Sequence, residues 1–453
     1  MRFCFISSFY PPYSFGGDAI YVRNLAEALA RREHEVDVIH CVDSFNLLAR
    51  GEPVEPLSKR RNITIHSLRS RLGGLSPLVA QQTGKTWPKT NAILEVLFSK
   101  KFDIIHYHNI SLLGPEVLWL RPDYQDFIKL YTMHEHWLIC PMHVLWKYNE
   151  RPCDNSACFR CTLSFRRPPQ WWRYTHLLKK CVASVDTFIS PSRFAQECHE
   201  ERGFKLPISR LPNFVPEVPE AIQPDVSPHP RPYFLYVGRL EKIKGIETLF
   251  PAFDRFRHID LLIAGAGTYD AELRGRATLM RNVLFLGLLP QAKLAPLYRH
   301  AIALLLPSVG HEVFPLVILE AFQQRTPVIA HAVGGVREVV EESGGGLLYA
   351  DAEGMLTALD RLINDTALRR TLGDRAYRAY RQKWNEESHL DGYFQLLEQV
   401  SVQKLGTAGW KVPSRGCLYF PRSLPSVNIA THPAISRRYC PSRPRSWTRY
   451  DIP

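Results

Sequence analysis

The sequence has no long apolar run. None of its apolar stretches approaches the roughly 18–20 residues that a membrane-spanning helix needs, and the start, MRFCFISSFYPP, soon meets two prolines. This start predicts a β-strand and a loop, because a signal peptide needs a longer apolar segment and a small-residue cleavage site. The chain has 10 cysteines in 453 residues, too few for a secreted disulfide scaffold. We therefore expect a cytoplasmic protein.

The folded body also has little excess charge. The formal net charge is +13, but nine basic residues and one acid lie in the last 50 residues, from Lys404, so only five of the positive charges belong to the first 403 residues. This small net positive charge of the first 403 residues does not predict a nucleic-acid partner. The tail 404–453 is rich in Pro, Ser and Arg without periodicity, which predicts disorder.

Short β-rich runs alternate with helical patterns along most of the chain, which predicts parallel sheets covered by helices. The predicted strands of the N-terminal half are 2–7, 36–41, 103–108, 127–134 and 186–190, and those of the C-terminal half are 233–238, 260–265, 283–287, 302–307, 327–330 and 346–350. A proline-rich stretch between them reads as a linker. We predict domains at 1–212 (with a cysteine-bearing insertion at about 140–170) and 233–383, a linker at 213–232 and a terminal helix at 384–403.

Ligands of such folds bind where strands end and helices begin. The predicted strand 233–238 ends at Gly238 and is followed by Arg239 and Lys244, two cations that suit a diphosphate. The alternative is a pair of solvated surface cations. After strand 260–265, Gly265 and Gly267 permit close approach of the backbone to a ligand, and the alternative is a plain tight turn.

The segment HEVFPLVILEAF (311–322) carries two glutamates in an apolar run. A helix starting near Phe314 would separate Glu312 from Glu320 by roughly 12 Å. Carboxylates accept hydrogen bonds from hydroxyls, so this spacing suits a ligand with a sugar at one end, a ribose at the other and a diphosphate between. A surface glutamate paired with an arginine is the ordinary alternative, and it fits poorly at Glu320, between Leu319 and Ala321.

The longer segment HEVFPLVILEAFQQRTPVIAHAVGGVREVVEESGGGLLY resembles the retaining glycosyltransferases of family 4, whose two-domain architecture is called GT-B. The N-terminal segments FYPPYSFGGDAIYVRNLAEAL, DIIHYHN, TMHEHWLICP and SPSRF look like others of that family, so the likeness covers roughly residues 1–400. The resemblance implies an α/β fold with two doubly wound, Rossmann-like domains that face each other across a cleft. It also implies sugar transfer from a nucleotide diphosphate sugar to a saccharide or lipid-linked acceptor.

The resemblance assigns roles by position. Gly16 and Gly17 would lie near the donor phosphates and the acceptor, and His134 near the C6 hydroxyl of the sugar. Arg239 and Lys244 would hold the diphosphate, Glu312 the sugar hydroxyls and Glu320 the ribose. The backbone of Phe314, Pro315 and Leu316 would face sugar and phosphate. Two residues depart from the family: Pro315 replaces a glycine and removes one N–H, and Glu135 replaces a common aspartate.

The chemistry expected from these residues is transfer without a metal. The departing diphosphate needs positive charge, and Arg239 and Lys244 supply it, whereas the sequence has no Asp-x-Asp pair of the metal-using kind. The resemblance implies retention of the anomeric configuration by front-side attack, in synthesis of cell-surface polysaccharide or glycoconjugate. The alternatives are a nucleotide-sugar epimerase, a phosphorylase, or a catalytically silent GT-B binding protein.

Four cysteines cluster in the predicted insertion: Cys140, Cys153, Cys158 and Cys161. Four thiolates suit tetrahedral zinc or an iron–sulfur cluster, and the alternatives are reduced structural thiols or a redox disulfide. The segments 85–101 and 166–180 mix basic and aromatic residues. Each alone reads as a core-facing helix with snorkelling lysines, but together they raise the hypothesis of peripheral contact with the inner face of a membrane.

Overall fold

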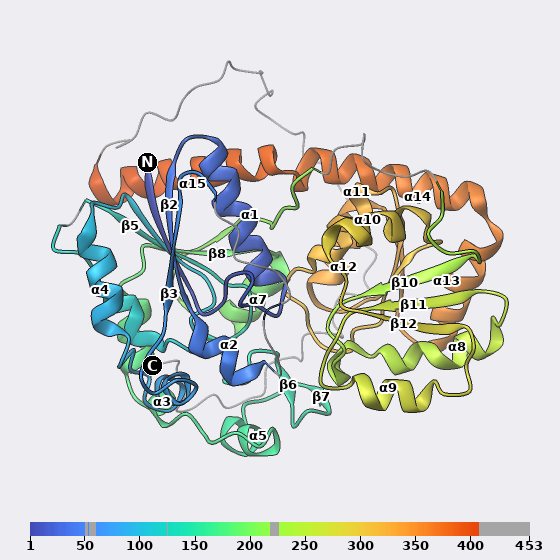
Figure 1. Ribbon diagram of the computed structural model, residues 1–453, viewed down its shortest axis with the longest axis horizontal. Coiled ribbons are helices and arrows are strands. Elements are labelled where there is room, and N and C mark those ends of the chain that lie inside the picture. The colour runs from blue at the N-terminus through green and yellow to red at the C-terminus, as the bar shows by residue number, and fades with distance from the viewer. Residues whose placement is uncertain (50–52, 54–59, 125, 218–225, 407–453) are drawn as a thin grey trace.

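The computed structural model describes residues 1–49, 53, 60–124, 126–217 and 226–406. The chain forms two sheets of parallel strands with helices on both faces, side by side in Figure 1, and the last helix runs along one side of the N-terminal sheet. Most of the tail predicted to be disordered, from residue 407, lies outside the described residues.

The N-terminal sheet has the strand order β3-β2-β1-β4-β5-β8-β9. Its strands are β1 Arg2–Ser7, β2 Glu35–Cys41, β3 Ile63–Leu68, β4 Ile104–Tyr107, β5 Ile128–Thr132, β8 Thr187–Ser190 and β9 Ile208–Arg210. Its helices are α1 Gly17–Arg31, α2 Val42–Leu48, α3 Leu75–Thr83, α4 Thr90–Ser99, α6 Leu177–Val182 and α7 Arg193–Glu201, with one-turn 3₁₀ helices η1 Pro115–Trp119 and η2 Trp171–Tyr174. The central strands β1 and β4 are buried on both faces, as continuous apolar runs predict.

Between β5 and α6 the chain is largely irregular. It forms a short antiparallel hairpin of β6 Trp146–Lys147 and β7 Arg151–Pro152, followed by α5 Cys158–Ser164. This hairpin and helix form the lower edge of the molecule in Figure 1, below the N-terminal sheet.

The C-terminal sheet has the order β12-β11-β10-β13-β14-β15. Its strands are β10 Tyr233–Val237, β11 Asp260–Ala264, β12 Val283–Gly287, β13 Leu304–Leu306, β14 Val328–His331 and β15 Gly346–Tyr349. Its helices are α8 Phe250–Arg255, α9 Asp270–Arg276, α10 Gln291–His300, α11 Leu316–Gln323, α12 Gly334–Ser343, α13 Ala352–Asn364 and α14 Thr366–Ala379, with η4 Lys242–Lys244 and η5 Ile246–Leu249. In both sheets the strand order reverses beside the first strand, where such folds bind ligands.

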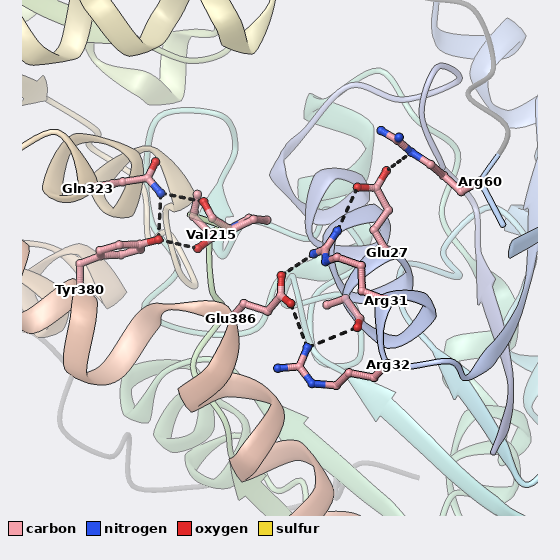
Figure 2. A network of polar contacts seen from close by, with 10 residues as sticks. Glu27, Arg31, Arg32, Arg60, Val215, Gln323, Tyr380 and Glu386 are labelled. Carbon is pink, nitrogen blue, oxygen red and sulfur yellow. Dashed lines mark hydrogen bonds and ion pairs between the residues drawn. The ribbon is translucent and has the colours of Figure 1, made fainter. Parts of the chain in front are cut away.

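The last helix, α15 Glu386–Leu405, returns from the C-terminal domain to the N-terminal sheet. Figure 2 shows how its start is held: Glu386 accepts hydrogen bonds from Arg31, the last residue of α1, and from the C-cap residue Arg32, the latter at 2.9 Å. Nearby, Tyr380 donates to the linker carbonyl of Val215 at 3.0 Å. These contacts tie the segment around the start of α15 to the C-terminal end of α1 and to the linker.

The sequence predicted the buried strands but not every element. Strands β3 and β9 were missed, since neither is fully buried and neither has a continuous apolar run. The predicted start of α11 near Phe314 is wrong by two residues: the helix starts at Leu316, with Pro315 as its extended N-cap at ψ 110°. Proline disfavours helical geometry in the residue before it, which explains the late start.

Candidate functional site

An ion pair joins two loops at the carboxyl ends of β10 and β13. Lys244 Nζ lies 2.9 Å from Glu312 Oε1, and both side chains are about one-fifth exposed. The Ser308 hydroxyl donates a short hydrogen bond to the same Glu312 oxygen. The structure thus brings together two predicted site residues that are 68 positions apart in the sequence.

The ionised form of Glu312 is stabilised in this position. Burial alone would raise its pKa, but the charge of Lys244 and the hydrogen bonds from Ser308 and Lys244 outweigh burial, and the pKa lies below its usual value. Arg239 acts in the same direction from a greater distance. Glu312 is therefore an anion fixed between donors.

Glycines hold these two loops together. Gly245, directly after Lys244, has a left-handed φ of 63°, and a Cβ there would collide with the carbonyl oxygen of Pro307. On the other side of Glu312, the Gly335 amide donates to the Glu312 carbonyl at 2.8 Å, and a Cβ on Gly335 would overlap the Val313 carbonyl. The close approach of these backbones fixes where Lys244 and Glu312 point.

Arg239 is more open than Lys244. Its side chain is 49% exposed and pairs with Glu241 at 2.8 Å, two residues along the same loop. The Tyr236 hydroxyl donates to its backbone carbonyl at 3.0 Å. An exposed guanidinium with one acidic neighbour retains free N–H groups for a phosphate.

Gly238, Gly265 and Gly267 lie where two loops cross. A Cβ on Gly265 would overlap the carbonyl oxygen of Gly238, and one on Gly267 would overlap that of Leu240. The small size of Gly265 and Gly267 is therefore required by the packing of one loop on the other. Contact of these glycines and of Gly238 with a bound donor stays a prediction.

Glu320 lies inside α11 and is 9% exposed. Its Oε2 accepts a hydrogen bond from the Tyr298 hydroxyl at 2.7 Å, and Gln291 also bonds to it. Burial raises the pKa of this carboxyl, and the two neutral donors and the distant charge of Arg23 lower it only in part. The surface ion pair that the sequence offered as an alternative is absent among the contacts of the described residues.

The start of α11 faces the glycine loop of the N-terminal domain. A Cβ on Gly17 would lie 3.5 Å from the Leu316 side chain, so the first turns of α1 and α11 are in contact across the two domains. The first amides of a helix have no partners within it, and Pro315 contributes none. Gly16 is the N-cap of α1. Asp18, two residues further along in the first turn, accepts a hydrogen bond from Asn109 at 3.0 Å.

His134 lies beside this contact, just after β5. It is partly exposed, and its ring is 5.0 Å from that of Tyr21 on α1. Burial of most of the ring lowers its pKa to about 4, and the charge of Asp18 opposes this effect. His134 is therefore neutral at neutral pH. Glu135, the next residue, pairs with His143 at 2.8 Å in the insertion.

The four clustered cysteines share one neighbourhood in the insertion. Burial raises the pKa of Cys140, Cys153 and Cys161, and the neighbouring thiols raise it further. Within the described part of the chain, no three His, Cys, Asp or Glu side chains are placed to hold one metal ion. Zinc or an iron–sulfur cluster at this place stays a prediction.

The sequence reasoning missed several residues of the site. Ser308 and Tyr298 bind the two glutamates, and His108 contacts His134 at 3.1 Å. None belongs to a pattern that separates it from an ordinary core residue. The Gly334–Gly335 doublet, inside the segment that resembles family 4, is the sequence signal for the packing of Gly335 on the Glu312 loop.

Comparisons with known proteins agree with this architecture. An uncharacterized glycosyltransferase of Methanocaldococcus jannaschii is 26% identical over 413 residues, which are 85% of this chain and 95% of that protein. Sucrose-phosphate synthase of Thermosynechococcus elongatus has a similar structure, with a TM-score of 0.66, 24% identity and coverage of 89% of this chain and 99% of that one. HepE of Anabaena, solved with UDP-glucose, gives a TM-score of 0.59 at 17% identity, over 88% and 100% of the two chains.

Two family models match consecutive parts of the chain. The model described as Glycosyltransferase Family 4 matches residues 15–217, and the model described as Glycosyl transferases group 1 matches residues 218–379. No helix among the described residues is long and apolar enough to cross a membrane. The two matches together span residues 15–379, which include every strand of both sheets except β1 and all of the site residues named above, so the chain belongs to the group 1 glycosyltransferases and has the GT-B fold.

Proposed function

We propose that this glycosyltransferase moves a sugar from a nucleotide diphosphate sugar to a saccharide or lipid-linked acceptor, with retention of the anomeric configuration. The observation that carries the proposal is the Lys244–Glu312 pair at 2.9 Å, which lies in the loops that precede α8 and α11. It places a fixed cation and a fixed hydroxyl acceptor next to each other, as a sugar diphosphate requires.

The diphosphate would lie against positive charge. Lys244 is held by Glu312, and Arg239 has half of its side chain exposed. The free N–H groups of the first turn of α11 add hydrogen-bond donors that carry a partial positive charge. These groups would stabilise the charge that develops on the departing nucleoside diphosphate, and we propose that no metal ion is needed for this step.

Each end of the donor would contact one of the two glutamates. Glu320, bonded to the neutral donors Tyr298 and Gln291, keeps lone pairs for the ribose hydroxyls. Glu312 would accept from hydroxyls of the transferred sugar, and His134 would contact the same sugar from the N-terminal domain. The UDP-glucose bound by the Anabaena protein of similar fold supports a donor of this class.

Retention would follow from front-side attack, in which the acceptor hydroxyl approaches on the side that the diphosphate leaves. The acceptor hydroxyl itself would be the nucleophile and the departing diphosphate oxygen would take its proton, so neither a protein nucleophile nor a protein base is required. The bond from the anomeric carbon to the diphosphate oxygen breaks, and the bond to the acceptor oxygen forms on the same face.

A nucleotide-sugar screen tests the proposal. A ligand that binds only the folded chain raises its melting temperature, so UDP-glucose, UDP-galactose, UDP-N-acetylglucosamine and GDP-mannose are compared with free UDP and GDP. We expect one base to stabilise the chain, and its sugar to add to the effect. Proton NMR of the product then reads the anomeric configuration. Conversion of the donor to its epimer without an acceptor would favour an epimerase, and donor binding without turnover on any acceptor would favour a silent binding protein.

A second proposal concerns a surface of the N-terminal domain. Three exposed aromatic residues, Phe159, Trp171 and Tyr174, form a chain with ring centroids 5.5 and 6.3 Å apart. Exposed Arg166 and Arg167 lie between them in the sequence. We infer that this aromatic surface rests on an anionic membrane that carries the acceptor of a cell-surface polysaccharide or glycoconjugate.

Flotation with vesicles of phosphatidylglycerol and phosphatidylcholine tests the membrane contact. We expect the chain to float at low salt, and Trp171→Ala to reduce the bound fraction at least threefold. Leu279→Ala is the matched control, because Leu279 is 94% exposed on the C-terminal domain. Equal flotation of the two variants, or none of the wild type at low salt, would contradict the contact.

A further inference from the structure

A second histidine stands behind His134. His108, just after β4, is buried, and its Nδ1 lies 3.1 Å from Nε2 of His134. The two ring planes are inclined by 22°, and their centroids are 5.3 Å apart. This is one hydrogen bond between two neutral rings, since burial lowers the pKa of both histidines. One ring must donate the proton in this hydrogen bond and the other must accept it. That choice also decides whether the second nitrogen of each ring carries a proton.

The surroundings of His108 decide which ring donates. Its other nitrogen, Nε2, is buried and has no hydrogen-bond partner in the described part of the chain. A proton on Nε2 would bury an unpaired N–H, which is costlier to leave unpaired than a bare acceptor. The proton of His108 therefore belongs on Nδ1, which donates to Nε2 of His134. A neutral His134 that accepts at Nε2 carries its own proton on Nδ1.

His108 cannot easily turn away from this arrangement. The Phe5 ring meets it edge to face at 5.2 Å, and the ring of His106 lies 4.1 Å away. His106 is itself fixed at both nitrogens, by the Tyr393 hydroxyl of α15 at 3.0 Å and by Thr132 at 2.8 Å. The last helix thus supports the histidines that stand behind the site.

The geometry points to His108 as a positioning residue that holds His134 in the Nδ1–H tautomer, so that His134 offers a hydrogen-bond donor to a hydroxyl of the transferred sugar. No hydrogen bond from the described residues occupies Nδ1 of His134. A donor N–H selects an oxygen lone pair of a sugar hydroxyl, and the opposite tautomer would present only an acceptor there. The role at the sugar rests on the proposed function, whereas the tautomer does not.

The tautomer is measured on the full chain without any ligand. Long-range ¹H–¹⁵N correlation spectra of ¹⁵N-histidine-labelled protein distinguish a protonated from a bare ring nitrogen, and the loss of one signal set in His134→Gln assigns His134. We expect a protonated Nδ1 and a bare Nε2 in the wild type. In His108→Leu the Nε2–H form should gain population, and His108→Asn should restore the wild-type pattern because its amide N–H can donate from the position of Nδ1.

His34→Leu is the matched control for a lost buried histidine. His34 is 8% exposed and precedes β2, at the amino ends of the strands, away from the site. The His34→Leu variant should leave the His134 spectrum unchanged even if it lowers the stability of the fold. A wild-type His134 protonated at Nε2, or a His108→Leu spectrum identical to the wild type, would overturn the inference.

Calorimetric titration tests the role at the sugar. The loss of one oriented hydrogen bond corresponds to about a 3- to 10-fold change, so His108→Leu should weaken UDP-glucose by that factor and leave UDP unchanged. Equal weakening of both ligands would overturn the role at the sugar. If the wild type bound neither ligand, UDP-glucose would be excluded as the donor and the role at its sugar would be overturned, whereas the spectra would still decide the tautomer.

Discussion

Glu312 and Glu320 lie in one short segment and have opposite environments. Glu312 pairs with Lys244 at 2.9 Å, and its pKa lies below the usual value. Among the described residues, the hydrogen-bond donors to Glu320 are the neutral side chains of Tyr298 and Gln291, and burial raises its pKa. The surroundings of Glu312 stabilise its ionised form, whereas burial destabilises the ionised form of Glu320.

The difference indicates two kinds of ligand contact. Under the proposed function, Lys244 would bind the diphosphate, and Glu312, which is paired with Lys244, would accept from hydroxyls of the adjoining sugar. A buried carboxylate with neutral donors gains most from further neutral donors, such as the hydroxyls of a ribose. Substitutions along the segment should therefore affect catalysis at one end, and binding and stability at the other.

The largest effect is expected from Lys244→Ala. Removal of a fixed group that stabilises charge in the transition state costs about 10²–10³ in kcat, and the turnover of the donor found in the nucleotide-sugar screen measures it. Lys242→Ala is the matched control, since Lys242 is in the same 3₁₀ turn but exposed. Similar turnover in the two variants would remove Lys244 from the reaction.

The next effect separates the two glutamates by the pH dependence of stability. Because the pKa of folded Glu312 is depressed, its ionisation stabilises the chain above the unfolded value of about 4.3, and this contribution is lost as the pH falls through the folded pKa. Glu312→Gln should thus lower the melting temperature at pH 7 by about 1–2 °C. The deficit should shrink as the pH falls below about 4.3.

Glu320→Gln should change stability in the opposite direction. The raised pKa of folded Glu320 means that its ionisation costs stability as the pH rises through the folded pKa. The variant should melt about 1–2 °C higher at pH 7 and match the wild type near pH 4. It should still bind nucleotide more weakly. Calorimetric melts across pH measure both variants, and shifts of the same sign would contradict the comparison.

The smallest effect is expected from Tyr298→Phe. The variant removes the 2.7 Å hydrogen bond to Glu320 and leaves the ring in place. Its loss should raise the pKa of Glu320 further and weaken UDP by about 3-fold at pH 7, with a smaller change in kcat. Tyr233→Phe is the control, because its hydroxyl bonds to the Leu297 carbonyl. A larger loss of kcat than of UDP affinity would place Tyr298 in the chemistry instead.

Much of the fold could be predicted because each central strand is a short, buried apolar run. The half-exposed β3 and the three-residue β9 lack that pattern and could not. Within the site, Lys244 and Glu312 were found separately, each as a residue that follows a strand. Their pairing depends on the crossing of loops at Gly245 and Gly335, which no local pattern encodes.

The histidines show the same limit. His134 was found through a resemblance, while His108 lies in a strand-like run, DIIHYH, where a histidine is ordinarily a buried core residue. Only the register of parallel β4 and β5, which pairs Tyr107 with Tyr131, brings the residues that follow both strands together. Contacts across a parallel sheet depend on distant segments and are therefore absent from local sequence patterns.

Calorimetric titration of UDP and GDP into the wild type, Lys244→Ala and Lys242→Ala tests the central proposal most directly. If Lys244 and the start of α11 hold the diphosphate of the donor, one nucleotide binds the wild type and Lys242→Ala alike, and its affinity falls at least 10-fold in Lys244→Ala, as expected for a lost charge-assisted contact of about 1.5–3 kcal/mol. Binding of neither nucleotide to the wild type, or equal affinity in all three proteins, would contradict it.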